Sequence, residues 1–210
     1  MHLTRQQVTT KLPIPRKGTK YIARASSHLS DSVSVLLAVR DMLKLAKNAK
    51  EVRRMVQDKL LKINGTLVMD AHESIKLFNH LEAGKMYRLS LLPTKKFVFE
   101  EIAAKDPSKD LRLVKVTNKR LIRGGKVQLN LHDGSNVLTS EKINVNDSLY
   151  LDKEGEIKKH FSPEKGKNAI VIEGKHTGKQ GVIESIEGSV CHLKVNREVL
   201  VVQIYQLIIQ

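Results

Sequence analysis

The sequence predicts an α+β multidomain protein with four parts: a basic extended arm (residues 1–30), a small α/β domain (31–93), a central β domain (94–160) and a C-terminal β-barrel (161–210). Two observations predict this organisation. Apolar residues recur at helical spacing early in the second part, whereas short strand-like segments separated by glycine-containing turns fill the two parts that follow. A length of 210 residues suits one or two ordinary domains or several small ones.

A formal net charge of +15 indicates an anionic partner, with nucleic acid favoured over an acidic membrane surface. No segment approaches the roughly 20 apolar residues of a membrane span, and the N-terminus lacks the apolar core of a secretory signal. A basic start without acids fits a mitochondrial presequence, but Pro13 and Pro15 interrupt the helix that such a signal needs. The single cysteine, Cys191, excludes an intrachain disulfide and fits a reducing cytoplasm.

The arm holds the densest positive charge, because residues 1–24 contain six basic residues and no acidic one. Pro13-Ile14-Pro15 favours extended backbone, and Gly18 permits a bend. Two interpretations stay open: a solvated tail, or an arm that lies along phosphates and becomes ordered only on binding RNA. We expect the second, with RNA contacts from Arg16, Lys17, Lys20 and Arg24.

The second part begins with N-cap candidates at residues 30–32. Four apolar residues at helical spacing predict a first helix that ends near Asn48; they are Leu36, Val39, Leu43 and Ala46. Three basic residues share a separate face of this helix at i, i+4 and i+7; they are Arg40, Lys44 and Lys47.

A second, shorter helix is predicted from about Ala49 to Asp58. Lys50, Arg53 and Arg54 fall at i, i+3 and i+4, so they share one surface. Taken alone, each basic stripe fits a solvated helix face as well as a binding face. Taken together, the stripes concentrate positive charge on adjacent helices and indicate RNA.

A β-hairpin is predicted next, from Leu61 to Leu67. Asn64-Gly65 lies between alternating residues, and both positions of such a turn need positive φ. Met86 to Leu92 predicts a further strand, which Pro93 ends.

A helix, a short basic helix and a hairpin with Ile63-Asn64-Gly65 together resemble the S-four RNA-binding domain of ribosomal proteins. The matching stretch before the turn is Ala49-Lys50-Glu51-Val52-Arg53-Arg54-Met55-Val56. The resemblance implies RNA contacts from both basic stripes and from Asn64 and Gly65. Two positions depart from the family pattern: Lys59 replaces its usual glycine, and Glu82-Ala83-Gly84-Lys85 replaces its Gly-Asp pair.

The central part predicts strands at residues 96–99, 111–116 and 126–131, and the pattern continues at Leu149-Tyr150-Leu151 and at Ile157, with Gly155 between them. Gly124-Gly125-Lys126 lacks the frame of a phosphate-binding loop, and His132-Asp133 fits a hairpin turn better than a catalytic pair. The run Gly124-Gly125-Lys126-Val127-Gln128-Leu129-Asn130-Leu131-His132-Asp133-Gly134 closely resembles the central domain of the archaeal and eukaryotic (e-type) S-four family of small-subunit ribosomal proteins. Residues 13–19 of the arm resemble archaeal members of that family.

Five short strands in the last part predict an SH3-like barrel. Its frame Ile172-x-Gly174-x-x-x-Gly178-x-x-Gly181-x-Ile183 resembles the KOW motif of ribosomal and transcription-elongation proteins. Lys175, His176 and Lys179 project from the glycine-rich loop, and we expect them to face RNA or a neighbouring protein. Cys191 is expected to be a small buried hydrophobe.

The e-type resemblance runs from the arm to the C-terminus. It implies a non-catalytic, cytoplasmic constituent of the small ribosomal subunit that contacts small-subunit rRNA and neighbouring small-subunit ribosomal proteins. It implies no cofactor, small-molecule substrate, membrane or obligate homo-oligomer. Because the chain ends just after the barrel, without the longer tail of eukaryotic members, we expect the archaeal form.

Two alternatives stay open. An RNA-modifying enzyme, or its non-catalytic remnant, is disfavoured because no cofactor-binding glycine fingerprint follows a strand. A transcription factor that applies a KOW barrel to polymerase is disfavoured by the basic helical domain. A metal site is not expected, because the eight histidines lack ligand spacing.

Overall fold

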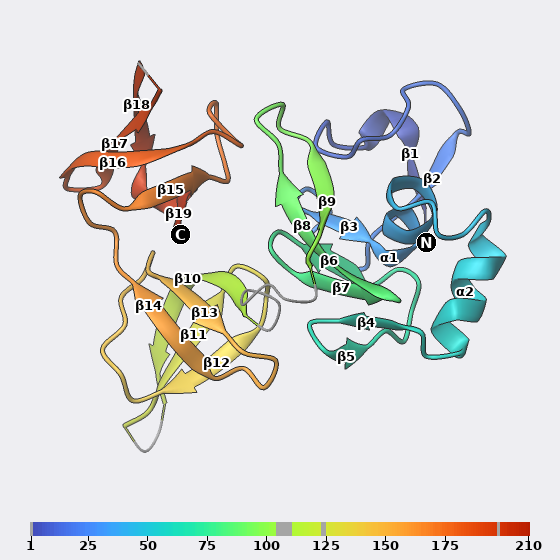
Figure 1. The fold of residues 1–210 in the computed structure, drawn as a ribbon, viewed down its shortest axis with the longest axis horizontal. Coiled ribbons are helices and arrows are strands. Elements are labelled where there is room, and N and C mark those ends of the chain that lie inside the picture. The colour runs from blue at the N-terminus through green and yellow to red at the C-terminus, as the bar shows by residue number, and fades with distance from the viewer. Residues whose placement is uncertain (1, 104–110, 123–124, 197) are drawn as a thin grey trace. The chain divides into compact units, whose positions relative to one another are not determined.

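The fold is described from a computed structural model, which describes residues 2–103, 111–122, 125–196 and 198–210. The chain divides into two compact units, residues 1–109 and 110–210. Strands dominate both units and helices are few, in the element order of Figure 1.

The first unit is built on a five-stranded antiparallel sheet in the order β5-β4-β7-β8-β9. Its strands are β4 (Leu61–Ile63), β5 (Thr66–Leu67), β7 (His80–Ala83), β8 (Lys85–Leu91) and β9 (Phe97–Glu101). The strand expected at residues 96–99 is therefore an edge strand of this first sheet, because β9 pairs with β8 from Tyr87↔Glu101 to Leu91↔Phe97.

The first helical segment is much shorter than the sequence predicts. One turn of α-helix, α1 (Val35–Leu37), continues as a π-helical turn, η2 (Ala38–Met42). Lys44 then adopts φ = 56°, a left-handed conformation that ends a helix. The expected i, i+4, i+7 stripe was therefore wrong, because only Arg40 of its three residues lies on the helical segment. Before α1, β3 (Ser32–Ser34) pairs with β6 (Ser74–Lys76).

The second helix, α2 (Ala49–Gln57), agrees closely with its prediction. Asn48, expected to stop the first helix, is instead the N-cap of α2, because its side-chain oxygen accepts a hydrogen bond from Glu51 N. The Asn64-Gly65 turn is also confirmed, with φ of 51° and 86°. Both residues are left-handed, as a two-residue hairpin of this type requires.

The arm is folded rather than extended. Strand β1 (His2–Thr4) pairs with β2 (Tyr21–Ala23), and a short 3-10 turn, η1 (Arg5–Gln7), follows β1. The backbone of Lys11 accepts a hydrogen bond from Phe97 N of β9, at 2.8 Å. The expected free extended arm was therefore wrong, because backbone pairing closes residues 2–23 into a loop held on the first unit.

The second unit begins with a five-stranded sheet in the order β12-β11-β10-β13-β14. Its strands are β10 (Arg112–Leu121), β11 (Val127–Leu131), β12 (Asn136–Thr139), β13 (Ser148–Leu151) and β14 (Ile157–Phe161). Its core contains Val114, Leu129 and Leu149, each fully buried. Gly124, the first residue of the run that resembles the e-type family, lies outside the described residues.

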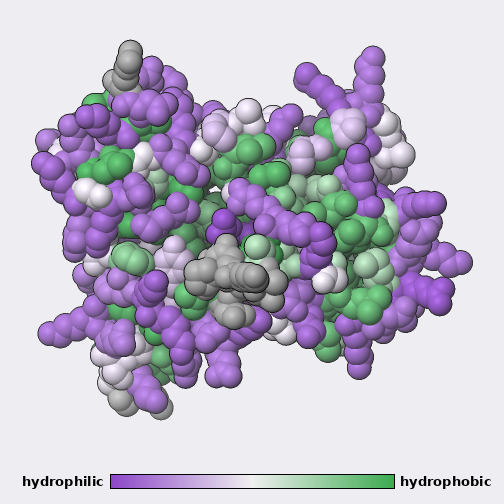
Figure 2. Space-filling model, viewed as in Figure 1, coloured by the Kyte–Doolittle hydropathy of each residue, from purple (hydrophilic) through white to green (hydrophobic). Residues whose placement is uncertain are grey.

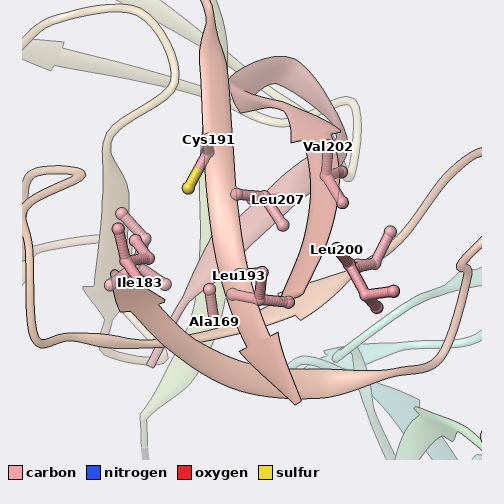
Figure 3. Packing of buried hydrophobic residues seen from close by; sticks show 9 residues of the cluster. Ala169, Ile183, Cys191, Leu193, Leu200, Val202 and Leu207 are labelled. Atoms are coloured by element: carbon pink, nitrogen blue, oxygen red, sulfur yellow. The ribbon is translucent and has the colours of Figure 1, made fainter. Parts of the chain in front are cut away.

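The barrel is the other five-stranded antiparallel sheet of the second unit, in the order β18-β17-β16-β15-β19. Its elements are β15 (Asn168–Val171), β16 (Gln180–Glu187), β17 (Val190–Val195), β18 (Glu198–Gln203), η4 (Ile204–Gln206) and β19 (Leu207–Ile209). The strands curl around an aliphatic core that includes Leu193, Ile183 and Cys191 (Figure 3). Cys191 is buried, as expected, and burial raises the pKa of its thiol.

Hydrogen bonds join the two sheets of the second unit. Ile209 N of β19 donates to Ser148 Oγ of β13, at 2.9 Å. The side chain of Lys115 on β10 reaches the backbone of η4. The barrel is therefore fixed to the preceding sheet by these polar contacts and by Phe161 of β14, which packs against the barrel core.

Candidate RNA-binding surface

The first turn of α2 uses its acidic residue for capping. The Glu51 carboxylate accepts hydrogen bonds from Lys47 N (2.7 Å) and from the side-chain amide of Asn48 (2.8 Å). Asn48 in turn caps Glu51 N at 2.9 Å. Because the carboxylate is held at the start of the helix, near the positive end of its dipole, it stabilises α2 there.

The basic face of α2 is exposed, as helical spacing predicts. Val52 is fully buried and anchors the opposite side, whereas Lys50, Arg53 and Arg54 are all exposed. Arg54 lies 3.7 Å from Asp58, but both side chains are more than half exposed, so this pair is weak. Hydrophilic side chains project from the surface over α2 (Figure 2). The helix therefore presents three neighbouring cations on a rigid element.

The C-terminal end of α2 has a residue in an unfavourable conformation. Leu60 N donates to Met55 O and Lys59 N donates to Val56 O, each at 3.0 Å, which is the Schellman arrangement. Lys59 occupies its left-handed position, at φ = 56°. Glycine is the usual residue there because a Cβ is strained in this region.

The three cations expected on the first helix, Arg40, Lys44 and Lys47, do not share one face. The Arg40 guanidinium forms two hydrogen bonds of 2.8 Å to Asp41, which raise its pKa and leave it engaged within the protein. Lys44 and Lys47 are exposed in the loop that leads into α2. The structure thus places these two lysines just before α2, but not on a common helix face with Arg40.

The arm forms a basic hollow of about 1150 Å³. Five of the residues that line it are cationic: Arg5, Arg16, Lys17, Lys20 and Lys96. Arg5 holds the loop together, because its guanidinium donates to Thr19 O (2.7 Å), Thr19 Oγ1 (3.1 Å) and the carbonyl of Pro15. Gly18 lies against this guanidinium at φ = 147°, where a Cβ would be 2.7 Å from Arg5.

Two other basic residues of the arm face the protein. Arg24 does not line the hollow; it is half-buried, and its carbonyl lies 2.9 Å from His72 Nδ1. Lys11 pairs with Asp31. Burial alone would raise the pKa of Asp31, but hydrogen bonds from Lys11 and Ser30 outweigh it and lower that pKa. Of the four arm residues expected to contact RNA, Arg16, Lys17 and Lys20 are therefore the ones that line the hollow and are exposed.

The Asn64-Gly65 turn is anchored to the sheet. Asn64 N donates to His80 O, and His80 N donates to the side-chain oxygen of Asn64, both at 2.9 Å. Asn64 is half-buried and Gly65 exposed. The Asn64 side chain therefore fixes the hairpin on β7, and the turn backbone is the part open to a partner.

The glycine-rich loop of the barrel is fixed from within. Thr177 is buried and donates to Gly174 O at 2.6 Å, while Gly178 N donates to Val171 O at 2.7 Å. Lys175 is exposed, and His176 and Lys179 are half-exposed. Lys179 lies 3.8 Å from Glu198.

Comparison with known proteins places this architecture in a family. A model of the ribosomal family S4e matches residues 83–157, and a model of the KOW motif matches residues 165–204. The chain is 35% identical to a protein of Methanospirillum hungatei named small ribosomal subunit protein eS4, over 88% of this chain and 80% of that one. The chain belongs to the S4e family of ribosomal proteins.

Other relatives agree with this assignment. The protein of the same name from Archaeoglobus fulgidus is 33% identical, over 88% of this chain and 80% of that one. The crystal structure of the 30S ribosomal protein S4e from Thermoplasma acidophilum matches the fold with a TM-score of 0.73 and 24% identity, over 86% of this chain and 95% of that one. The chain is of the archaeal form of the S4e family.

The sequence did not predict the structural roles of two basic residues in this S4e chain, Arg5 and Lys115. By sequence, Arg5 is one more cation of a free arm. Its role in closing the loop is not visible there, because its partners are backbone and hydroxyl groups 10 to 14 residues away. Lys115 belongs to the strand expected at residues 111–116, where nothing in the local pattern predicts burial, yet the residue is only 2% exposed.

The described residues contain neither a cluster of metal ligands nor a membrane-spanning helix. No group of three or more His, Cys, Asp or Glu side chains is placed to hold a metal ion within that part of the chain. No helix in the described ranges is long and apolar enough to cross a membrane. Asp133 of the His132-Asp133 pair binds Arg112 at 2.7 Å and Ser135 at 2.6 Å, which gives it a role in the β11–β12 turn.

Proposed function

We propose that this S4e protein is a structural constituent of the small ribosomal subunit that binds its large rRNA, through phosphate contacts and recognition of RNA shape. Family membership supports the proposal, because the relatives are named small ribosomal subunit protein eS4. The observation that carries the RNA contact is the exposed face of Lys50, Arg53 and Arg54 on α2.

The geometry of α2 suits phosphate binding. Cations at i, i+3 and i+4 lie about 5–6 Å apart at their Cβ atoms, so adjacent phosphates of one strand can be met together. Each contact releases condensed counterions from the RNA, which gives binding that weakens as salt rises. Because A-form RNA exposes little base identity to side chains in its deep groove, a rigid basic face recognises shape first.

The arm and the barrel loop supply further contacts in this proposal. Arg16, Lys17 and Lys20 face the hollow of the arm, and Lys175 projects from the loop between β15 and β16. His176 and Lys179 flank Lys175 and extend this loop surface. Neighbouring small-subunit proteins are the expected protein partners.

Co-sedimentation of the full chain tests the proposal directly. Tagged protein expressed in an archaeal host should sediment with small ribosomal subunits and should remain with them at moderate salt. Recovery with RNA polymerase, and not with small subunits, would refute the proposal in favour of a transcription factor. Binding of a methyl-donor cofactor by the purified chain would instead favour an RNA-modifying enzyme.

A further inference from the structure

Strands β10, β11 and β12 lie side by side in one sheet of the second unit (Figure 1). Their register places two rows of mostly polar side chains on one outward face of this sheet. Residues directly opposite one another in an antiparallel sheet point to the same side. The register aligns the first row as Asn118, Asn130 and Asn136. It aligns the second row as Arg120, Gln128 and Leu138. We call these six residues the amide face.

Burial shows which side of the sheet the amide face occupies. Leu129 and Leu131, which alternate with Gln128 and Asn130 along β11, are 0% and 4% exposed and belong to the core. On the amide face, Asn118, Arg120 and Asn136 are exposed, and Leu138 is 60% exposed. The amide face is therefore the solvent side of this sheet.

The amide face has hydrogen-bonding capacity left for a partner. The side-chain oxygen of Asn118 accepts from Lys119 N at 2.8 Å, and that of Asn130 accepts from Gln128 Nε2 at 3.4 Å. Among the residues that the structure describes, no hydrogen bond engages the amide nitrogens of Asn118 and Asn130. These donors are thus available to an acceptor outside the chain.

The charge of the amide face is positive. Neither row contains a carboxylate, and Arg120 belongs to no ion pair within residues 2–103, 111–122, 125–196 and 198–210. Ile122 N donates to Lys126 O at 2.9 Å, which continues the ladder past Leu121↔Val127. Lys126 is exposed and alternates with Val127, so it lies on the side of Gln128 and extends the amide face.

We propose that the amide face is a second RNA-binding surface, separate from α2, and that small-subunit rRNA occupies it. The inference rests on the proposed function in one respect, that the ligand of the chain is RNA. Two cations match phosphates, and several amides match the 2′-hydroxyls and base edges that RNA presents as both donors and acceptors. A protein partner would call for an apolar centre, whereas Leu138 is the single large apolar side chain in the two rows.

Salt-dependent binding of the full chain to full-length large rRNA of the small subunit tests this proposal, because charge and amides leave different signatures. The variant Arg120→Ala with Lys126→Ala should lower the slope of log affinity against log salt by about 1.4–1.8, at roughly 0.7–0.9 per phosphate. Asn118→Ala with Asn136→Ala should weaken binding by at least about fivefold, and up to about a hundredfold, at an unchanged slope, since two neutral hydrogen bonds are lost.

The matched control is Lys142→Ala with Lys159→Ala, which removes the same charge from exposed positions outside the amide face. If the control and the Arg120/Lys126 variant lose the same amount of slope, the effect is one of net charge, and the proposal of a local binding site is overturned. Unchanged RNA affinity of both test variants, with lost incorporation into subunits, would assign the face to a protein and overturn the proposal. If the α2 variant Lys50→Ala/Arg53→Ala/Arg54→Ala weakens binding while these do not, this inference alone fails.

Discussion

The ammonium group of Lys115 donates a hydrogen bond to the carbonyl oxygen of Tyr205, at 2.6 Å, and a second to that of Ile204, at 3.1 Å. Lys115 lies on β10 and its acceptors lie in η4, so a buried cation joins the central sheet to the barrel. A 3-10 turn leaves carbonyls without partners at its end, and the ammonium supplies a donor to that of Tyr205, whereas the carbonyl of Ile204 also accepts from Leu207 N within the turn. Burial lowers the pKa of Lys115 to about 8, an effect that the charge of Glu173 only partly offsets.

This burial predicts that the second unit becomes more stable as the pH rises from about 8 to 10.5. The folded pKa lies below the unfolded value of 10.5, so the unfolded chain binds more protons in this window and the cost of burying the charge disappears. The gain is at most about 3 kcal/mol. Urea unfolding of the native protein and of Lys115→Met should differ in this pH dependence. Parallel pH profiles of the two proteins would contradict the assignment.

Replacing Lys59 with glycine should stabilise the first unit by about 1 kcal/mol. Lys59 is in the left-handed position of the Schellman motif after α2, where glycine avoids the steric cost of a Cβ. Chemical denaturation measures the free energy of unfolding. Lys59→Ala is the control, because alanine keeps the Cβ and should give no such gain; equal stabilisation by both changes would argue against backbone strain as the cause.

Replacing Gly181 with alanine should destabilise the barrel by about 1–3 kcal/mol, as overpacking does. A Cβ at this position would lie 2.8 Å from Val195 Cγ2 and closer still to the carbonyl oxygen of Lys194 on the neighbouring strand. Gly188→Ala is the matched control, since a Cβ there meets nothing within 4 Å and incurs only the conformational cost of φ = 60°. Thermal unfolding should show the larger loss for Gly181→Ala, and the reverse order would contradict the close approach.

Arg5→Ala should open the loop of the arm without unfolding the first unit. The guanidinium is the group that links η1 to the carbonyls of Pro15 and Thr19, so its loss frees residues 12–19, while Lys11 stays held by Phe97 N and Asp31. Limited trypsin digestion should then cut faster after Arg16 and Lys17, both exposed. Gln7→Ala, at an exposed position in the same turn, serves as the control. Equal cleavage rates in the two variants would show that Arg5 does not hold the loop.

Removing the three cations of α2 should flatten the salt dependence of rRNA binding. Lys50→Ala/Arg53→Ala/Arg54→Ala should lower the slope of log affinity against log salt by about 2–3, at roughly 0.7–0.9 per phosphate. The control removes three exposed lysines of the second unit, Lys142, Lys159 and Lys165. If the control variant lowers this slope and the α2 variant leaves it unchanged, α2 is not part of the RNA interface.

Local signals predicted the elements of the first unit that depend on local chemistry. Helical spacing predicts α2, although Asn48 is its N-cap and not the end of the first helix, and the Asn64-Gly65 pair predicts the hairpin with its positive φ values. The length of the first helix was not predictable in this way. Its apolar spacing continues to Ala46, but the chain leaves the helix at Lys44, and β3 is fixed by pairing with β6, 40 residues along the sequence.

The missed functional residues depend on contacts that are distant in sequence. A lysine in a strand is expected at the surface, and Lys115 is buried only because the barrel supplies carbonyls 89 and 90 residues further along the chain. The amide face was hidden for a similar reason, because Asn118, Asn130 and Asn136 become one row only through the register of three strands.

Cross-linking of the protein to RNA inside native small ribosomal subunits tests the central claim most directly. The account predicts that peptides from residues 49–57 are recovered attached to the large rRNA of the subunit, through Lys50 or its neighbours on the exposed face of α2. Subunits that contain the protein but yield RNA-linked peptides only from other parts of the chain would contradict it.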